Sequence, residues 1–386
     1  MRKYITWIFI KKLIDPLNLF SYIIWNPDPI FLRFGTFTIF WYSFLFALGF
    51  IISRFVIIFI YKVEKRFKNN LDFLLLYMIV GTVIGARIGH VLFYEPFKYL
   101  NNPIDILKIW EGGLSSHGCA VGILIALYFY VYKIELKGKK WQITKHHRQG
   151  HSWLQIVDRM AIVVALGSIF IRFGNFMNSE IIGTPTGSNY GVVFVGTKIQ
   201  KIKNRIPAVK TIRIIDQDAN LNTNHPKLTL EIQLYERISS LEKATNILIK
   251  NVKPLLIKKQ KIPTLIRTED GRMNVIKTSQ GYKGYFKMNG IVRHPSQLYE
   301  AVVCLLTFLI LLFVWSKKKD QTSHGLIWGL FLLFIFGSRI LQEVIKENNV
   351  AFGNDFVLNQ GQLLSIPFVL LGLLLIRRAY LKSTSD

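Results

Sequence analysis

The stretch LDFLLLYMIVGTVIGARIGHVLF, from Leu71 to Phe93, decides the fold class. A helix that crosses a bilayer needs about 20 mostly apolar residues, and this stretch has that length and composition. Six further stretches share or nearly share the pattern: Phe37–Ile60, Leu114–Tyr132, Val157–Phe176, Ser296–Trp315, Gly325–Leu341 and Leu363–Ile376. The sequence therefore predicts an all-α integral membrane protein with seven transmembrane helices.

The composition of the whole chain agrees with this prediction. Of its 386 residues, 51% are hydrophobic and only 19% are charged. A soluble chain with so few charges could not cover its own surface, which excludes an ordinary cytosolic enzyme and a disordered chain. Cys119 and Cys304 lie far apart in apolar runs and support neither a disulfide framework nor a zinc site. The formal net charge of +26 suggests loops that face anionic lipid headgroups before it suggests nucleic acid.

Short basic loops predict the orientation of the spans, because Lys and Arg are enriched on the cytoplasmic side. Basic residues follow the first, third, fifth and seventh spans, within Lys62–Lys68, Lys133–Arg148, Lys317–Lys319 and Arg377–Lys382. These four regions alternate as cytoplasmic loops should. The N-terminus is then outside and the C-terminus is cytoplasmic, and the short apolar core of Val157–Phe176 has to cross.

Two regions are expected to lie outside the bilayer core. Residues 1–36 are predicted to form an N-terminal interfacial segment, since Lys11 and Lys12 interrupt the apolar run and no signal-peptide cleavage site follows. Residues 181–293, between transmembrane helices 1–4 (37–180) and 5–7 (294–386), are predicted to form a small α+β insertion on the outer side. Within the insertion we expect one helix over Glu231–Asn251 and short strands over Tyr190–Gly196 and Thr211–Ile215. It is either a solubilising insertion or a basic face for anionic lipid.

Polar side chains gather at one depth, at the outer ends of the predicted spans, while the cytoplasmic halves are expected to be apolar. A charged side chain inside a span costs at least about 2.5–3.5 kcal/mol on insertion scales and usually marks function. In four spans these residues are spaced three or four apart, so that each pair shares one helix face. A single pair could simply order the bundle, but so many at one level predict a polar cavity open to the outer leaflet. The set is Tyr42, Arg87, His90, His117, Arg172, Asn175, His294, Gln297, Glu300, Arg339, Glu343 and Gln362.

The types of polar residue indicate an anionic ligand. The planar guanidinium of arginine matches phosphate oxygens in pairs, and a phosphate at this depth implies a phospholipid headgroup. The histidines add acid–base chemistry near neutral pH. His147 and His151 have the spacing of metal ligands on a helix, but they lie in the basic cytoplasmic loop, so we expect no metal. Glycines such as Gly85 and Gly118 beside the polar residues indicate close helix packing, although they could equally let a lipid tail approach.

Three functions fit such a cavity: an enzyme that acts on a lipid, a transporter or scramblase for an anionic lipid, and a non-catalytic binder of signal-peptide helices. A transporter would need polar residues through the inner halves of the spans. Many transporters also have an internal repeat, and none is visible here. The enzyme is therefore the favoured hypothesis, and formation of a product would separate it from the other two.

Four blocks of sequence resemble the signatures of the prolipoprotein diacylglyceryl transferase family. They are GARIGH (Gly85–His90), WEGGLSSHG (Trp110–Gly118), RFGNFMNSE (Arg172–Glu180) followed by Gly183, and RHPSQLYE (Arg293–Glu300). The resemblance covers nearly all of the membrane part in order. It implies an enzyme of the bacterial inner membrane that needs no cofactor. It would move the diacylglyceryl group of phosphatidylglycerol onto the lipobox cysteine of prolipoproteins and release glycerol 1-phosphate.

The resemblance also implies roles for individual residues. Arg172 would bind the phosphatidylglycerol headgroup, Arg339 would stabilise the leaving phosphate or hold a second lipid, and His117 is the candidate base for the incoming thiol. Cys119, two residues after His117, raises the alternative of a covalent relay through the enzyme. The remaining expected substrate-binding residues are Tyr42, Arg87, Asn175, Glu180, Gly183, His294, Glu300 and Glu343.

Overall fold

The computed structural model describes residues 22–35, 37–65, 69–108, 113, 115–137, 140–145, 152–217, 224–258, 262–268, 272–347 and 358–383. The expectations for residues 1–21 and for His147 and His151 lie outside this part. The chain divides into two compact units. The first unit contains Met1–Phe46, Phe170–Ala301 and Leu341–Asn359, and the second unit contains Ala47–Ile169, Val302–Ile340 and Gln360–Asp386.

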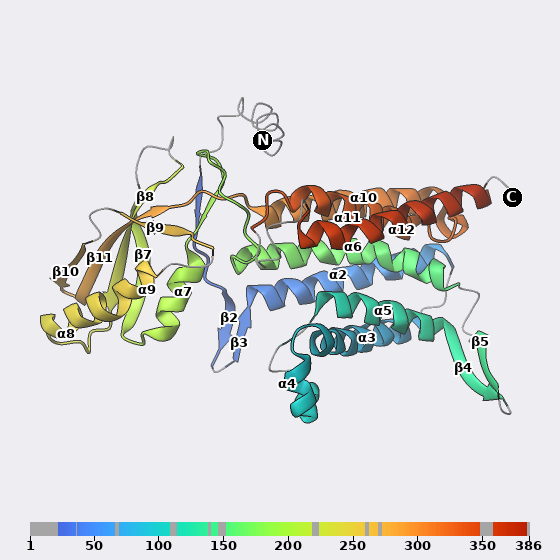
Figure 1. Cartoon of the computed structure of the whole chain (residues 1–386), viewed down its shortest axis with the longest axis horizontal. Helices are drawn as coiled ribbons and strands as arrows, with labels where there is room; N and C mark the ends of the chain where they lie inside the picture. The colour runs from blue at the N-terminus through green and yellow to red at the C-terminus, as the bar shows by residue number, and fades with distance from the viewer. Residues whose placement is uncertain are drawn as a thin grey trace. The chain divides into compact units, whose positions relative to one another are not determined.

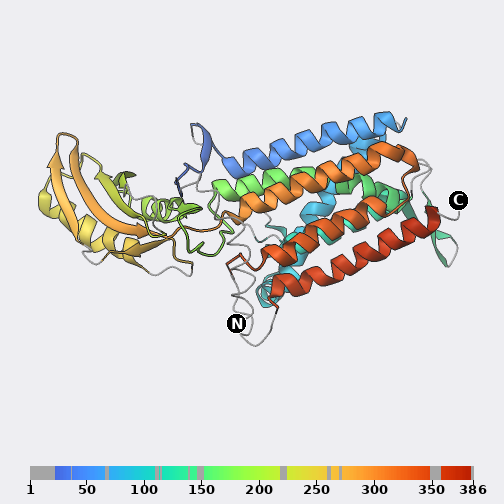
Figure 2. The same cartoon turned by 90° about the horizontal axis from the view of Figure 1, so that it is seen from above.

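The second unit is built from apolar helices (Figures 1 and 2). In the described part of the chain, five helical segments are long and apolar enough to cross a membrane: Trp41–Val63, Leu71–Phe93, Trp153–Met177, Ser296–Gln321 and Gly361–Lys382. Two shorter apolar helices, Gly118–Val131 and Leu326–Gln342, coincide with the predicted third and sixth spans. A helical membrane protein is therefore confirmed. The helices are α2 (Trp41–Val63), α3 (Asn69–Phe93), α5 (Ser116–Val131), α6 (Trp153–Met177), α10 (Ser296–Lys318), α11 (Leu326–Gln342) and α12 (Gln360–Ser383).

Helix α6 is the most enclosed of the candidate spans. Sixty-one per cent of its apolar window is buried, against 17% to 33% in the other four. Its residues Ile156 and Ile162 pack in one apolar core with Ile60 from α2 and Leu311 from α10. A central helix is held on several sides, so the polar groups that it carries are fixed in position.

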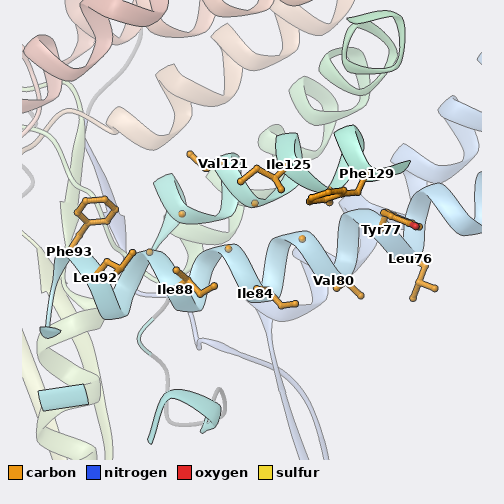
Figure 3. Close-up of a pocket in the computed structure, with 16 residues that line it drawn as sticks. Leu76, Tyr77, Val80, Ile84, Ile88, Leu92, Phe93, Val121, Ile125 and Phe129 are labelled. Carbon is orange, nitrogen blue, oxygen red and sulfur yellow. The ribbon is translucent and has the colours of Figure 1, made fainter. Parts of the chain in front are cut away.

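Helices α3 and α5 meet through their backbones. A methyl group added to Gly89 would lie 2.6 Å from the α-carbon of Gly118, and one added to Gly81 would lie 2.6 Å from the β-carbon of Ala126. Glycine is required at such an approach because any side chain would force the helices apart. Figure 3 shows the apolar side chains on both sides of this contact, among them Ile84 and Ile125, which line an open groove of about 790 Å³.

We expected the halves of the spans opposite the predicted polar residues to be apolar, but in α6 that half carries buried charges. Arg159, in the N-terminal half of α6, pairs with Glu64 at 2.7 Å, and their side chains are 2% and 1% exposed. Beside them Asp158 accepts hydrogen bonds from the backbone N–H groups of Gly325 (2.7 Å) and Trp328 (2.8 Å) at the start of α11. Charges can be buried at this level because each one has a partner.

The first unit contains an antiparallel sheet in the order β10-β11-β8-β7, with β9 also paired to β11. Helices α7, α8 and α9 lie against one face of the sheet (Figures 1 and 2). Leucines and isoleucines that alternate along β7 and β8 form its core with Ile199 of α7, Leu256 of α9 and Leu248 of the turn between α8 and α9. The elements are α7 (Gly196–Arg205), β7 (Val209–Gln217), β8 (Lys227–Leu234), α8 (Leu241–Asn246), the π-helical turn η3 (Ile247–Val252), α9 (Lys253–Ile257), β9 (Leu265–Arg267), β10 (Met273–Thr278) and β11 (Gly281–Gly290).

The α+β character of residues 181–293 is confirmed, but one of its expected elements was wrong. Residues 231–234 end strand β8 and the helix begins only at Leu241, so no single helix spans Glu231–Asn251. The reason is the alternation in KLTLEIQL, where Leu228, Leu230 and Ile232 point into the core. The two expected strands are present, as part of β6 (Val192–Phe194) and of β7.

Further short elements connect these parts. Strand β1 (Ile23–Trp25) pairs in parallel with β6. Strands β2 (Ile30–Phe34) and β3 (Phe37–Phe40) form a hairpin before α2, so the first span begins at Trp41 rather than at Phe37. In the second unit, α4 (Pro96–Asn101) and the 3-10 turn η1 (Pro103–Leu107) follow α3, and β4 (Tyr132–Lys137) and β5 (Lys140–Lys145) form a hairpin after α5. A 3-10 turn, η4 (Lys319–Gln321), follows α10.

Candidate functional site

The first polar contact of the site joins the end of α6 to the start of α10. The Nη1 atom of Arg172 lies 2.9 Å from Oε2 of Glu300, and the two side chains are 27% and 8% exposed. The distance is that of an ion pair, yet Oε2 of Glu300 receives no aligned hydrogen bond from the described residues. A guanidinium carries five N–H donors, and within the described residues most of those of Arg172 remain available to a ligand.

Lys346, in the turn after α11, completes this contact, and sequence reasoning missed it. Its Nζ atom lies 3.2 Å from Oε1 of Glu300 and donates a hydrogen bond to it. The same nitrogen lies 3.6 Å from Oε1 of Glu343, three residues earlier. Arg172, Glu300, Lys346 and Glu343 thus form a row of alternating positive and negative charges, which we call the charge row. The spacing of Glu343 and Lys346 was the available signal, but it falls outside a predicted span.

Tyr42, at the start of α2, and Asn175, on α6, lie near Arg172. A methyl group added to Gly174 would lie 2.8 Å from Cδ2 of Tyr42, so the ring of Tyr42 packs directly on α6 between the positions of Arg172 and Asn175. The side chain of Asn175 is 5% exposed. Tyr42 can lie this close to α6 only because residue 174 is glycine, and this contact places the ring near Arg172 and Asn175, as predicted.

A tight turn after α6 brings the remaining predicted residues of this unit to the charge row. Ser179 and Ile181 both have φ of 54°, which is rare for residues other than glycine. The turn is held by the side-chain amide of Gln297, which donates to the carbonyl of Glu180. Gly183 then donates its N–H to the carbonyl of His294 at 3.0 Å and forms a β-bridge with Lys346.

His294 is buried next to this turn. Its side chain is 7% exposed, and its Nδ1 atom lies 3.3 Å from the hydroxyl of Tyr299. Burial lowers the pKa of His294 to about 4, so the ring is neutral at neutral pH. Its Nε2 atom is buried and has no hydrogen-bond partner among the described residues.

The second unit holds Arg87, His117 and Arg339. Arg87 is 4% exposed and donates to the carbonyl oxygens of Asp105, Ile106 (2.7 Å) and Gly113 (3.3 Å). These bonds tie α3 to η1 and to Gly113. His117 lies in the first turn of α5, but its side chain is outside the described residues. Arg339 lies half-buried in the last turn of α11.

The arrangement in the first unit is suited to recognising an anion. Arg172 is partly exposed and has N–H donors available within the described residues. The neighbouring carboxylates, Glu300 and Glu343, are already in contact with Lys346. In the described part of the chain, no cluster of three or more His, Cys, Asp or Glu side chains could hold a metal ion. The N–H donors of Arg172 can bind an anion and polarise it.

Comparison with known proteins gives one consistent result. The sequence profile of the family described as prolipoprotein diacylglyceryl transferase matches residues 29–378. The phosphatidylglycerol–prolipoprotein diacylglyceryl transferase of Tolumonas auensis is 33% identical over 351 residues, which cover 91% of this chain and 95% of the relative. The proteins of the same name from Chloroherpeton thalassium and Porphyromonas gingivalis are 30% and 31% identical, over 95% and 94% of this chain and 98% and 96% of their own length.

Proposed function

This chain belongs to the prolipoprotein diacylglyceryl transferase family, and on that premise we propose that it transfers the diacylglyceryl group of phosphatidylglycerol to prolipoproteins. The observation that carries the proposal for the site is the Arg172–Glu300 contact, in which a partly exposed arginine keeps donors available at the end of a central membrane helix. A phosphodiester headgroup is the anion that such a position would meet.

The reaction is a displacement by sulfur. The thiol of the acceptor cysteine attacks the glycerol carbon that carries the phosphate, a C–S bond forms and the C–O bond to phosphate breaks. The diacylglyceryl group is then bound to the protein as a thioether, and glycerol 1-phosphate leaves with the electron pair of the broken bond. The thiol proton passes to a base.

Arg172 is the residue that we assign to the phosphate. Its N–H donors would bind the headgroup in the ground state and hold the phosphate more tightly as negative charge develops on the leaving oxygen. Donors that are already oriented toward developing charge lower a barrier by about 3–4 kcal/mol each. Glu300 holds the guanidinium from one side, and Tyr42 and Asn175 border it along α6.

His117 is the base that we propose for the acceptor thiol. A free thiol has a pKa of about 8.5, so only a few per cent is thiolate at neutral pH and a base within reach would raise its reactivity. We assign Arg339 to the leaving phosphate or to a second lipid, and Arg87 to securing the segment before His117 through its three carbonyl contacts. Glu180, Gly183, His294 and Glu343 would shape the site around the charge row.

The acceptor and the topology complete the proposal. The acceptor is the lipobox cysteine that follows a signal-peptide helix and therefore emerges near the outer leaflet. We propose seven spans in the bacterial inner membrane, with the N-terminus outside and the C-terminus in the cytoplasm. The basic loops of the sequence support this orientation.

The test uses the purified chain in detergent with phosphatidylglycerol and a lipobox peptide, followed by mass spectrometry. We expect a diacylglyceryl mass increase on the peptide cysteine, release of glycerol phosphate, and loss of both in Arg172→Ala. A folded protein that binds phosphatidylglycerol but forms no adduct would contradict the proposal, and transport of the lipid across vesicles would then be measured.

A further inference from the structure

We propose that Lys346 is a positioning residue that neutralises Glu300 and so keeps the guanidinium of Arg172 available for the anionic headgroup. The inference rests on the proposed function, because it assigns Arg172 to phosphatidylglycerol. It goes beyond that function in naming the group that sets the affinity for the lipid. Lys346 acts through its two neighbours and does not have to touch the reacting atoms.

The two carboxylate oxygens of Glu300 contact different cations, and only one of these contacts is a hydrogen bond. Oε1 accepts a hydrogen bond from Lys346 at 3.2 Å. Oε2 lies 2.9 Å from Arg172 but receives no aligned hydrogen bond from the described residues. Oε1 is therefore hydrogen-bonded by lysine, while Arg172 contributes charge beside Oε2 without an aligned hydrogen bond to it.

The burial of Glu300 explains why a second cation is needed. Its side chain is 8% exposed, and an ionised carboxylate that is taken out of water is costly unless it is paired and hydrogen-bonded. With Arg172 alone, Glu300 would draw the guanidinium into an aligned pair. That pair would have no net charge and fewer donors for a phosphate. A lysine on the other oxygen removes this competition.

The backbone around Lys346 fixes the ammonium at this point. Lys346 forms an isolated β-bridge with Gly183, and the N–H of Thr184 donates to the carbonyl of Ile345 at 2.8 Å. Glu343 adds a second, longer contact to the lysine at 3.6 Å. The lysine side chain therefore extends from a segment that is held by the same turn that follows α6.

The prediction for kinetics is a change in lipid affinity. Lys346→Gln should raise the KM for phosphatidylglycerol about tenfold, with kcat changed by less than about twofold, because the headgroup must now compete with Glu300 for Arg172. Lys346→Arg should recover most of the affinity, since it keeps the positive charge. In a Glu300→Gln background the same Lys346→Gln change should cost about twofold or less, because no carboxylate remains to compete.

The experiment measures KM and kcat of the full-length enzyme in detergent, with phosphatidylglycerol varied and the peptide product followed by mass spectrometry. Binding of phosphatidylglycerol to each variant is measured separately in nanodiscs, so that a loss of chemistry is not mistaken for a loss of affinity. The matched control is Lys283→Gln, which breaks a lysine–glutamate contact of 3.0 Å with Glu231 on the sheet. This control should leave KM and kcat unchanged.

Each outcome decides for or against the proposal. A KM for Lys346→Gln equal to that of the Lys283→Gln control would overturn it. So would a fall in kcat at constant KM and constant binding, or an equal effect with and without Glu300. If Lys346→Gln does not fold, two other comparisons decide: Lys346→Arg against the wild type, and the Glu300→Gln, Lys346→Gln double variant against Glu300→Gln alone. A KM for phosphatidylglycerol within about twofold of the reference in both comparisons supports charge neutralisation, and a larger rise in either contradicts it. A wild-type enzyme that binds the lipid but forms no adduct would refute the proposed function, while the affinities measured in nanodiscs would still test the role of Lys346.

Discussion

Helix α6 carries two arginines that each pair with a glutamate from another part of the chain, and the two pairs differ in burial and in hydrogen bonding. At its N-terminal end, Arg159 pairs with Glu64 at 2.7 Å, and both side chains are almost fully buried. Glu64 also accepts the indole N–H of Trp315 at 2.8 Å. At its C-terminal end, Arg172 lies 2.9 Å from Glu300 and is 27% exposed.

The difference lies in how far the donors are committed. Arg159 uses Nε to bind Glu64 at 2.8 Å and Nη2 to bind the carbonyl of Lys319 at 3.0 Å. Arg172 makes no aligned bond to Oε2 of Glu300 within the described residues. Nη1 of Arg159 has no hydrogen-bond partner among the described residues, but the side chain is only 2% exposed. A buried pair with aligned bonds orders the bundle, and a partly exposed pair without an aligned bond can bind a ligand. Burial and donor use thus separate a structural pair from a site, although both pairs look alike in sequence.

The largest effect that would test this comparison is on stability, at Arg159. Arg159→Ala leaves the Glu64 carboxylate buried without its cation, and breaking such a pair costs about 3–5 kcal/mol. We expect a lower thermal midpoint in detergent and a lower yield of folded protein, with near-normal activity in the fraction that remains folded. The control is Arg54→Ala, because the Arg54–Asp72 pair is 47% and 75% exposed and such pairs contribute about 0–1 kcal/mol. Equal midpoints for the two variants would show that the buried pair has no structural role.

The next effect is on activity, at Arg172. Arg172→Ala should reduce the rate of diacylglyceryl transfer about 10²- to 10³-fold, the usual consequence of losing a donor to developing charge. Arg172→Lys should recover little, because lysine lacks the planar fork. The thermal midpoint of both variants should stay close to that of the wild type, in contrast to Arg159→Ala. A nearly wild-type Lys variant would show that two-point binding by the guanidinium is not needed.

The two pairs also show what the sequence could and could not predict. Apolar runs predicted six of the helices to within about four residues at each end, because the length of a span is set by the bilayer. The last helix ends at Ser383, seven residues beyond the predicted end at Ile376. Motif positions predicted that Tyr42, Arg172, Glu300 and Gly183 belong to one site, and the first unit does hold these residues near one another. These predictions rest on patterns that are local in sequence.

Predictions failed where the partner lies far away in the chain. Nothing near Arg159 in sequence indicates Glu64, which is brought to it by helix packing. Lys346 looks like an ordinary loop cation until the fold places Glu300 beside it. The helix expected over Glu231–Asn251 overlooked the alternation of Leu228, Leu230 and Ile232, a signal that was present in the sequence.

A smaller effect is expected from His294, which lies in the first unit but is buried like the Arg159 pair. The pKa of His294 is about 4 in the folded protein and about 6.5 in the unfolded chain. The neutral ring therefore contributes fully to the free energy of unfolding above pH 6.5, and this contribution is lost as the pH falls from 6.5 toward 4. The free energy of unfolding should fall by up to about 1.4 kcal/mol per pH unit in that window, or ~3 kcal/mol in total. His294→Gln should flatten this part of the curve of thermal midpoint against pH. An identical slope in both proteins would show that His294 is not the titrating group.

The smallest effect is expected at Cys119. A Cys119 variant tests whether the acceptor thiol attacks the lipid bound at Arg172 directly or whether the diacylglyceryl group passes first through an enzyme thiol. The displacement needs one thiol, which the acceptor supplies, so no enzyme cysteine has to form an intermediate. Cys119 follows Gly118 at the close contact of α5 with α3, and its thiol hydrogen-bonds with Thr82. Serine is close in size and keeps a hydroxyl for that bond, so Cys119→Ser should change neither turnover nor thermal midpoint beyond about twofold and a few tenths of a kcal/mol.

Initial rates of the two proteins, together with the intact mass of the enzyme during turnover, measure this effect. A relay through Cys119 would require a diacylglyceryl adduct on the wild-type enzyme that is absent from Cys119→Ser, and a large loss of rate in the variant. That result would move the first bond formation to the sulfur of Cys119 and leave Arg172 with lipid binding alone. With no adduct and an unchanged rate, the partly exposed pair at the end of α6 keeps both binding and stabilisation of the leaving phosphate.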